Sequence, residues 1–132
     1  MPDAVEVILY VADQARARAF WAAALGREPV LDVPGMTSFE LPGGGVRLGL
    51  MPAADIVALL GPGLPDPRSA DGVPRAELYL LEANVAAAVD RLLAAGAVPV
   101  SPLLARPWGD VAAYFLDPDG HVVAVAERGA RA

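Results

Sequence analysis

The chain carries one pattern of hydrophobic and polar positions twice. In each copy an apolar strand-like run is followed by a capping residue, an Ala-rich helical stripe, a closing glycine and further strand-like runs. Glu6 and Glu77 hold matching places in the two opening runs, and the closing glycines, Gly26 and Gly96, are 70 residues apart. Each sheet must bury one face against another layer. The pattern therefore predicts an α+β fold of two tandem β-α-β-β-β modules.

The first copy predicts a strand over residues 6–11, with Asp13 as the N-cap of the helix that follows. That helix ends at Gly26, which can adopt positive φ. Its apolar positions fall at helical spacing and include Ala17, Phe20, Trp21, Ala24 and Leu25. Further strands are expected over 29–33, 37–41 and 46–51, with a hairpin turn at Pro42-Gly43-Gly44-Gly45.

The second copy predicts a strand over residues 76–82, Asn84 as an N-cap and a helix that stops at Gly96. Strands are expected over 98–101, 111–116 and 122–127, whereas residues 101–110 are left open between strand and loop. Asp117-Pro118-Asp119-Gly120 predicts a tight turn, because proline presets φ and glycine supplies positive φ. We expect this turn, and His121 after it, to be structural.

Length and composition favour one globular domain over residues 1–132. Module one is expected at about 4–52, a Pro- and Gly-rich linker at about 53–74 and module two at about 75–128. The net charge is −6 with no Lys at all, so a nucleic-acid partner is not expected. Apolar runs are too short to cross a membrane, and the start lacks the features of a secretory signal, which predicts a cytoplasmic protein. With no Cys, disulfides and thiolate sites are excluded.

Several short segments carry a family resemblance. Val11-Ala12-Asp13, Ala19-Phe20-Trp21 and Leu25-Gly26 in the first half are followed by Leu92 to Gly96, Pro107-Trp108-Gly109 and Asp117 to Gly120 in the second. In order and spacing these resemble the vicinal-oxygen-chelate superfamily, which includes glyoxalase I, extradiol dioxygenases and bleomycin-resistance proteins. The resemblance implies that each module forms a curved half-barrel sheet, that two modules enclose a cleft, and that modules pair across a homodimer.

Enzymes of this superfamily hold a divalent metal on side chains of the first and fourth strands of each module. The matching positions here are Glu6, Gly49, Glu77 and Ala124, two of which have no side-chain donor. Two carboxylates are too few ligands for a typical metal site, since Zn²⁺ takes three or four protein ligands and Mg²⁺ or Mn²⁺ takes a larger number of oxygen ligands. We therefore expect no metal, no other cofactor and no catalytic residue; if any metal binds, Glu6 and Glu77 are its ligands.

The metal-free branch, the bleomycin-resistance-type proteins, departs from the metal pattern in the same way and binds planar aromatic or peptide ligands in large grooves. Alternation along the opening strands places Glu6 with Tyr10 and Glu77 with Tyr79 on one face each. We expect the carboxylates to meet a donor-rich ligand, the aromatic rings to stack on it, and the small residues to leave room for it. The expected ligand-binding residues are Glu6, Tyr10, Phe39, Gly49, Met51, Glu77, Tyr79, Trp108, Tyr114 and Ala124.

The sequence thus predicts a metal-free homodimer that binds and sequesters an aromatic natural-product or peptide antibiotic, in self-resistance or as a carrier in biosynthesis. One alternative is a metal-dependent lyase, transferase or dioxygenase with an atypical site. Another is a structural or regulatory module without a small-molecule ligand.

Overall fold

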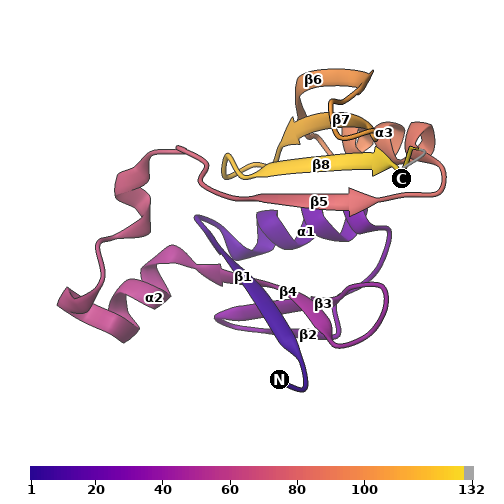
Figure 1. The fold of residues 1–132 in the computed structure, drawn as a ribbon. Helices are drawn as coiled ribbons and strands as arrows, with labels where there is room; N and C mark the ends of the chain where they lie inside the picture. Colours follow the sequence, from indigo (N-terminus) through magenta and orange to yellow (C-terminus); the bar gives the residue numbers. More distant parts are fainter. Residues whose placement is uncertain (130–132) are drawn as a thin grey trace. The chain divides into compact units, whose positions relative to one another are not determined.

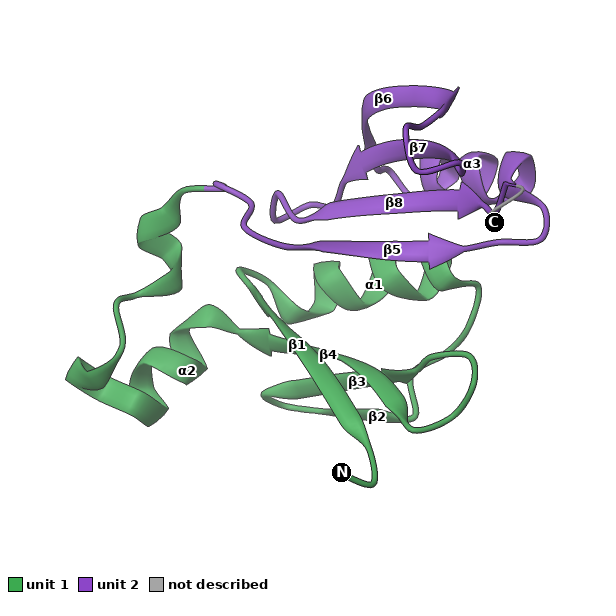
Figure 2. Cartoon of the chain, in the orientation of Figure 1, with its two compact units in different colours: residues 1–71 green, residues 72–132 purple. Residues whose placement is uncertain are grey.

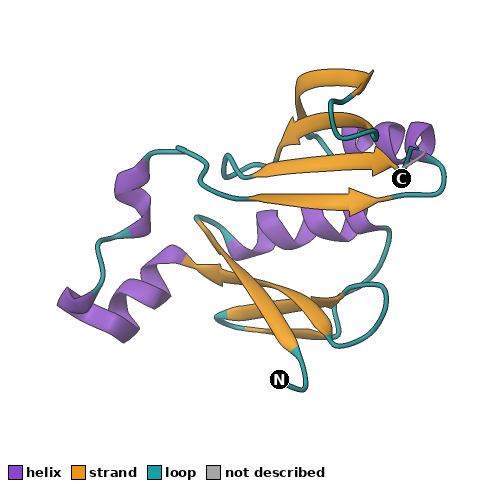
Figure 3. Ribbon diagram, in the orientation of Figure 1, coloured by secondary structure: helices purple, strands orange, loops and turns teal. Residues whose placement is uncertain are grey.

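The computed structural model of the chain describes residues 1–129 and divides them into two compact units (Figures 1 and 2). The first comprises residues 1–71 and the second begins at residue 72. Each unit has its own four-stranded sheet, and neither sheet closes into a barrel (Figure 3). The predicted α+β fold of two β-α-β-β-β modules is confirmed.

The first unit contains β1 (Val5–Val11), α1 (Gln14–Leu25), β2 (Leu31–Val33), β3 (Met36–Glu40) and β4 (Val46–Pro52). The strand order is β1-β4-β3-β2, in which β1 and β4 are parallel and the other pairs antiparallel. The first and fourth strands of the module are therefore neighbours. Each expected element of this module forms within one or two residues of its predicted bounds.

Helix α1 begins and ends where the sequence indicates. The Asp13 side chain accepts a hydrogen bond from the Arg16 N–H at 2.9 Å, and Gly26 caps the C-terminus with φ 67°. The helix buries one stripe, Ala17, Phe20, Trp21 and Ala24, against the sheet. The sheet side of this core is formed by Phe39, Leu48 and Leu50, which are all fully buried.

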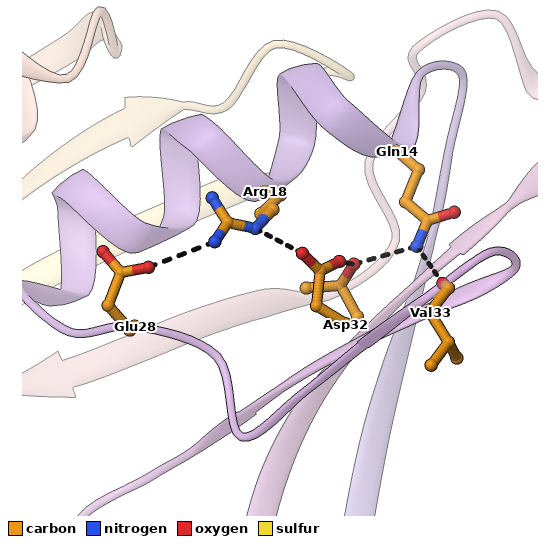
Figure 4. A network of polar contacts seen from close by, with 6 residues as sticks. Gln14, Arg18, Glu28, Asp32 and Val33 are labelled. Atoms are coloured by element: carbon orange, nitrogen blue, oxygen red, sulfur yellow. Dashed lines mark hydrogen bonds and ion pairs between the residues drawn. The ribbon is translucent and has the colours of Figure 1, made fainter.

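A polar network fixes α1 to the β2–β3 hairpin (Figure 4). Gln14 Nε2 donates to the carbonyl of Val33 at 2.8 Å and to Thr37 Oγ1 at 2.9 Å, and Arg18 Nε donates to Asp32 Oδ2 at 2.7 Å. Asp32 and Thr37 are register partners, so their side chains share one face of the sheet. That face is the one covered by α1.

The second unit repeats this order with β5 (Glu77–Leu81), α3 (Val85–Ala94), β6 (Val98–Ala105), β7 (Val111–Leu116) and β8 (Val122–Glu127). Its strand order, β5-β8-β7-β6, matches that of the first unit. The Asn84 side chain caps α3 by accepting from the Ala87 N–H. Strand β6 extends to Ala105 through two register shifts, so much of the segment that the sequence left open is strand.

The expected linker region contains helices that the sequence pattern did not predict. Helix α2 (Ala53–Leu60) follows β4 directly, and two 3₁₀ turns, η1 (Gly61–Gly63) and η2 (Pro67–Ala70), come after it. The boundary between the two units falls just after η2. None of the helices within residues 1–129 is long and apolar enough to cross a membrane.

Candidate functional site

The sheets present equivalent rows of residues on the face opposite the helix. In the first unit the row across the strands is Ile8, Gly49, Ser38 and Leu31. In the second unit it is Tyr79, Ala124, Tyr114 and Ser101. Glu6 and Glu77 each precede the first member of their row by two residues, so they point to the same face of their own sheet. We call these surfaces the carboxylate face and the aromatic face, after the side chains described next.

The carboxylate face is organised around Glu6. Ser38, which is buried, donates its Oγ–H to Glu6 Oε2 at 2.7 Å. Gly49 lies between these residues in the sheet, and a Cβ built on it would collide with Oε2 of Glu6 and lie 3.1 Å from Cγ1 of Ile8. The glycine therefore allows the carboxylate to cross the central strand and reach the serine hydroxyl.

This arrangement corrects one expectation about Gly49. The sequence predicted that the absent side chain would leave room for a bulky ligand, but the Glu6 carboxylate fills that space. Tyr10, 37% exposed, and Met51, half-buried, are register partners farther along the same face. A hollow of about 380 Å³ lies toward the start of β1, where the charged Glu6, Glu40 and Arg47 line it together with the apolar Ala4, Val5 and Val46.

Phe39 was wrongly placed among the ligand-binding residues. It pairs in register with Leu48, has no exposed surface and lies on the face that α1 covers. Strand alternation explains the error: Phe39 follows Ser38, whose hydroxyl contacts Glu6, so its ring must point to the other side of the sheet. Phe39 belongs to the core of the first unit.

The aromatic face is organised around Trp108. Arg106 to Gly109 form a turn in which the Gly109 N–H donates to the Arg106 carbonyl at 3.0 Å, and Gly109 takes φ 101°. Trp108 remains 48% exposed as a residue, and its Nε1–H donates to the Tyr79 hydroxyl at 2.9 Å. The two rings are tilted by 60° with centroids 6.4 Å apart. The structure thus brings together two of the predicted aromatic residues.

Tyr79 is in turn held by Asp110, a residue that the sequence did not single out. The Tyr79 hydroxyl donates to Asp110 Oδ2 at 2.7 Å, and the Asp110 side chain is fully buried. Burial raises the pKa of Tyr79 and the hydrogen bond to Asp110 raises it further, while the Trp108 N–H acts in the opposite direction. Tyr79 is therefore a neutral phenol at physiological pH.

Tyr114, on the other side of Ala124, is covered by Arg106. The Arg106 guanidinium lies 5.0 Å from the centre of the Tyr114 ring, within the range of a cation–π contact. Arg106 also donates to the carbonyls of Pro102 and Ala112 and to Ser101 Oγ, which ties β6 to β7. Burial and the charge of exposed Glu77 raise the pKa of Tyr114, and Arg106 opposes this.

Alanines form the floor of the aromatic face. Ala124 and its neighbours Ala112 and Ala126 have no exposed surface. Because Ala112 and Ala126 are register partners, the three small side chains lie together on the sheet. Ala124 is thus buried between the strands that carry Tyr79 and Tyr114.

The residues at the superfamily's metal positions do not fit a metal centre. Gly49 and Ala124 offer no donor atom, and the space above Gly49 is taken by the carboxylate of Glu6. That carboxylate already accepts a hydrogen bond from Ser38. Within residues 1–129 the one cluster of three potential ligands is Asp117, Asp119 and His121, which lies elsewhere, in the β7–β8 turn.

That turn uses its polar groups to hold its own shape. Asp117 Oδ1 accepts from the N–H groups of Asp119 and His121, and Oδ2 lies 2.8 Å from Nδ1 of His121. Burial disfavours the charged imidazole, but the hydrogen bond and charge of Asp117 and the charge of Asp119 outweigh it and raise the pKa of His121. These contacts stabilise the turn itself, as expected for a structural role.

The chain belongs to the Glyoxalase/Bleomycin resistance protein/Dioxygenase superfamily, whose sequence profile matches residues 4–125. No curated protein sequence matches it.

Solved structures share this fold over nearly the whole chain. A glyoxalase-related enzyme from Fulvimarina pelagi has a TM-score of 0.80 at 23% identity, covering 97% of this chain and 89% of its own. TnmS3, an antibiotic binding protein from Streptomyces sp. CB03234, has a TM-score of 0.70 at 23% identity, covering 98% of both chains. A glyoxalase/bleomycin resistance protein from the same organism has a TM-score of 0.64 at 26% identity and covers 92% of this chain and 97% of its own.

Proposed function

We propose that this protein binds a planar aromatic ligand through the aromatic face of its second unit, without a metal, and sequesters or carries that ligand unchanged. The observation that carries the proposal is Trp108, a large apolar ring that is half exposed yet fixed by a hydrogen bond. Holding an exposed ring in one orientation costs side-chain entropy and leaves apolar surface in water. A flat ligand stacked on the indole offsets both costs.

The chemistry around Trp108 supports an aromatic ligand. Stacked or edge-to-face aromatic pairs contribute about 0.5–1.5 kcal/mol beyond the area that they bury. Glu77 is exposed on the same face, two residues before Tyr79, and offers a carboxylate to a cation or hydrogen-bond donor at the ligand's edge. The similarity to the antibiotic binding protein TnmS3 makes an aromatic antibiotic the class of natural ligand that we propose.

Titration calorimetry with two planar probes tests the proposal: proflavine, a cation, and anthraquinone sulfonate, an anion. We expect proflavine to bind more tightly, because the chain carries a net charge of −6 and exposed Glu77 lies on the same face of the sheet. Trp108→Ala should weaken binding by roughly tenfold or more, since truncated aromatic hot spots commonly lose about 2 kcal/mol.

The matched control is Leu93→Ala, which removes another exposed apolar side chain, 47% exposed, from helix α3, which covers the opposite face of the same sheet. It should leave binding within about twofold of the wild type, a difference of roughly 0.4 kcal/mol. Failure of both probes to bind at about 1 mM, which corresponds to about −4.1 kcal/mol, would contradict the proposal. So would equal binding by Trp108→Ala and the wild type.

Elemental analysis and mass spectrometry separate a binder from a metal-dependent enzyme. We expect less than stoichiometric zinc, manganese, nickel or iron in protein purified without chelator, because two of the four superfamily ligand positions lack donors. The probe should also be recovered with its mass unchanged after incubation. One metal per chain that is lost in Glu6→Ala would overturn the metal-free assignment.

We also propose that the protein acts as a homodimer. Symmetric dimers are the commonest oligomers, and strand β6 exposes Val98, Val100 and Leu104 at the edge of its sheet. Sedimentation equilibrium should report a species of twice 13.6 kDa. A species of 13.6 kDa at every concentration would contradict this part of the proposal.

A further inference from the structure

We propose that Asp110 and Tyr79 are positioning residues that set the plane of the Trp108 ring before any ligand arrives, so that a ligand meets the face of the indole and not its N–H. The inference deepens the proposed function and rests on it for the identity of the ligand.

Asp110, Tyr79 and Trp108 are joined by a series of two hydrogen bonds. Buried Asp110 accepts from the Tyr79 hydroxyl at 2.7 Å, and the oxygen of that hydroxyl accepts from Trp108 Nε1 at 2.9 Å. An indole has one donor and no acceptor, and a phenol has one O–H to donate. The donors of both aromatic side chains are therefore already used within the protein.

Both ends of this series of hydrogen bonds are fixed. Asp110 directly precedes strand β7: its carbonyl accepts from the Arg106 N–H at 2.8 Å, and its Oδ1 accepts from the Gly129 N–H at 3.4 Å. Trp108 lies in the turn just before it, and Arg106 at the start of that turn is held by four donated hydrogen bonds. With both ends fixed, the Tyr79 hydroxyl holds the indole in one orientation.

The hydrogen bond of the Trp108 N–H determines which part of the indole a ligand can use. Because the Trp108 N–H is occupied, an acceptor on the ligand gains nothing by approaching it. Binding then depends on contact with the ring face, which favours flat, extended π systems of varied substitution. Fixing the ring in advance removes the entropy cost of ordering it on binding.

Nuclear magnetic resonance of the ligand-free ¹⁵N-labelled protein tests the positioning directly, because the chain has two tryptophans and each gives one indole N–H signal. In the wild type, the Trp108 N–H should exchange with solvent roughly tenfold or more slowly than free tryptophan despite the exposure of its ring. Tyr79→Phe keeps the ring but removes the hydroxyl. It should shift the Trp108 signal, abolish that protection and leave the signal of Trp21, which is buried in the first unit, in place.

Tyr10→Phe is the matched control, since Tyr10 lies on the carboxylate face; it should change neither indole signal. Proflavine should bind Tyr79→Phe roughly two- to tenfold more weakly than the wild type, as expected when one side chain must be ordered on binding. Asp110→Asn, which retains an acceptor for the phenol, should give an intermediate loss.

The outcomes for the two proposals are separable. A Trp108 N–H that exchanges as fast as free tryptophan in the wild type overturns the positioning role, even if Tyr79→Phe fails to fold. The same holds if a folded Tyr79→Phe leaves the Trp108 signal and its protection unchanged. If Trp108→Ala binds proflavine normally while the Trp108 N–H of the wild type is protected from exchange, the proposed function is contradicted. The positioning of Trp108 by Tyr79 and Asp110 is then still supported.

Discussion

The two units share one strand order but carry different side chains on the open faces of their sheets. On the carboxylate face the central residue of the row is Gly49, and the Glu6 carboxylate crosses it to reach Ser38. On the aromatic face the equivalent residue is Ala124, and tyrosines stand on the strands at either side. In the first unit the missing Cβ of Gly49 leaves the space that the Glu6 carboxylate takes up, whereas in the second unit the Cβ of Ala124 stands at the equivalent position.

The hairpin turns explain why only the second unit carries an exposed tryptophan. In the first unit β2 and β3 are joined by Pro34 and Gly35 alone. In the second unit the equivalent connection runs from Arg106 to Asp110, long enough for Trp108 to reach back to Tyr79. The ligand-binding surface that we propose thus depends on loop length as much as on residue type.

The largest expected effect tests the contrast between the helix-covered and open sides of the sheets. Phe39→Ala should lower the free energy of unfolding by about 3–5 kcal/mol, because it opens a cavity in a closed core. Tyr10→Ala, on the open face of the same sheet, should cost less than half as much. Chemical denaturation of both variants measures the difference. Equal costs would mean that Phe39 does not belong to the core.

A smaller effect tests the packing of the carboxylate face. Gly49→Ala should lower the free energy of unfolding by about 1–2 kcal/mol, because the new methyl group displaces Glu6 and leaves the buried Ser38 hydroxyl without its acceptor. In a Glu6→Ala background the same substitution should cost clearly less, since the colliding carboxylate is gone. A double-mutant cycle measures this coupling. Additive costs would show that Glu6 does not occupy the space above Gly49.

The smallest effect concerns pH and the turns that join the last two strands of each unit. His121 has a raised pKa when folded, so its contribution to stability is complete below the unfolded value of about 6.5. That contribution is lost as pH rises through the folded pKa. The equivalent turn of the first unit, Pro42 to Gly45, has no titratable side chain.

Unfolding of the wild type and of His121→Gln, followed from pH 5.5 to 8.5, measures this contribution. The difference in free energy of unfolding should be about 1 kcal/mol at the acidic end, as for one hydrogen bond, and shrink as pH rises. A difference that grows with pH would mean that the neutral imidazole is the stabilising form.

Much of the fold was predictable because it rests on local signals. The caps at Asp13, Gly26 and Asn84, the helical stripes and the alternating strands are written in short stretches of sequence. The repeated order of those stretches also matched Glu6 with Glu77, the family resemblance matched Gly49 with Ala124, and the strand register agrees with both equivalences.

The candidate site was less predictable because its contacts join distant residues. Tyr79 and Asp110 are separated by 31 positions and Glu6 and Ser38 by 32, and no local pattern indicates either pair. Phe39 could have been assigned to the core from its alternation with Ser38, but only once the register against β4 was known. Asp110 gives one usable signal: a carboxylate directly before an apolar strand needs a partner if it is buried.

The most direct test of the central claim is the intrinsic fluorescence of the two tryptophans during a titration with proflavine. Binding at the aromatic face should quench the emission of exposed Trp108 and spare that of buried Trp21. In Trp108→Phe the remaining emission should come from Trp21 and change little on addition of the probe. If Trp108→Phe is quenched as strongly as the wild type at the same occupancy, the ligand does not bind at Trp108 and the account is contradicted.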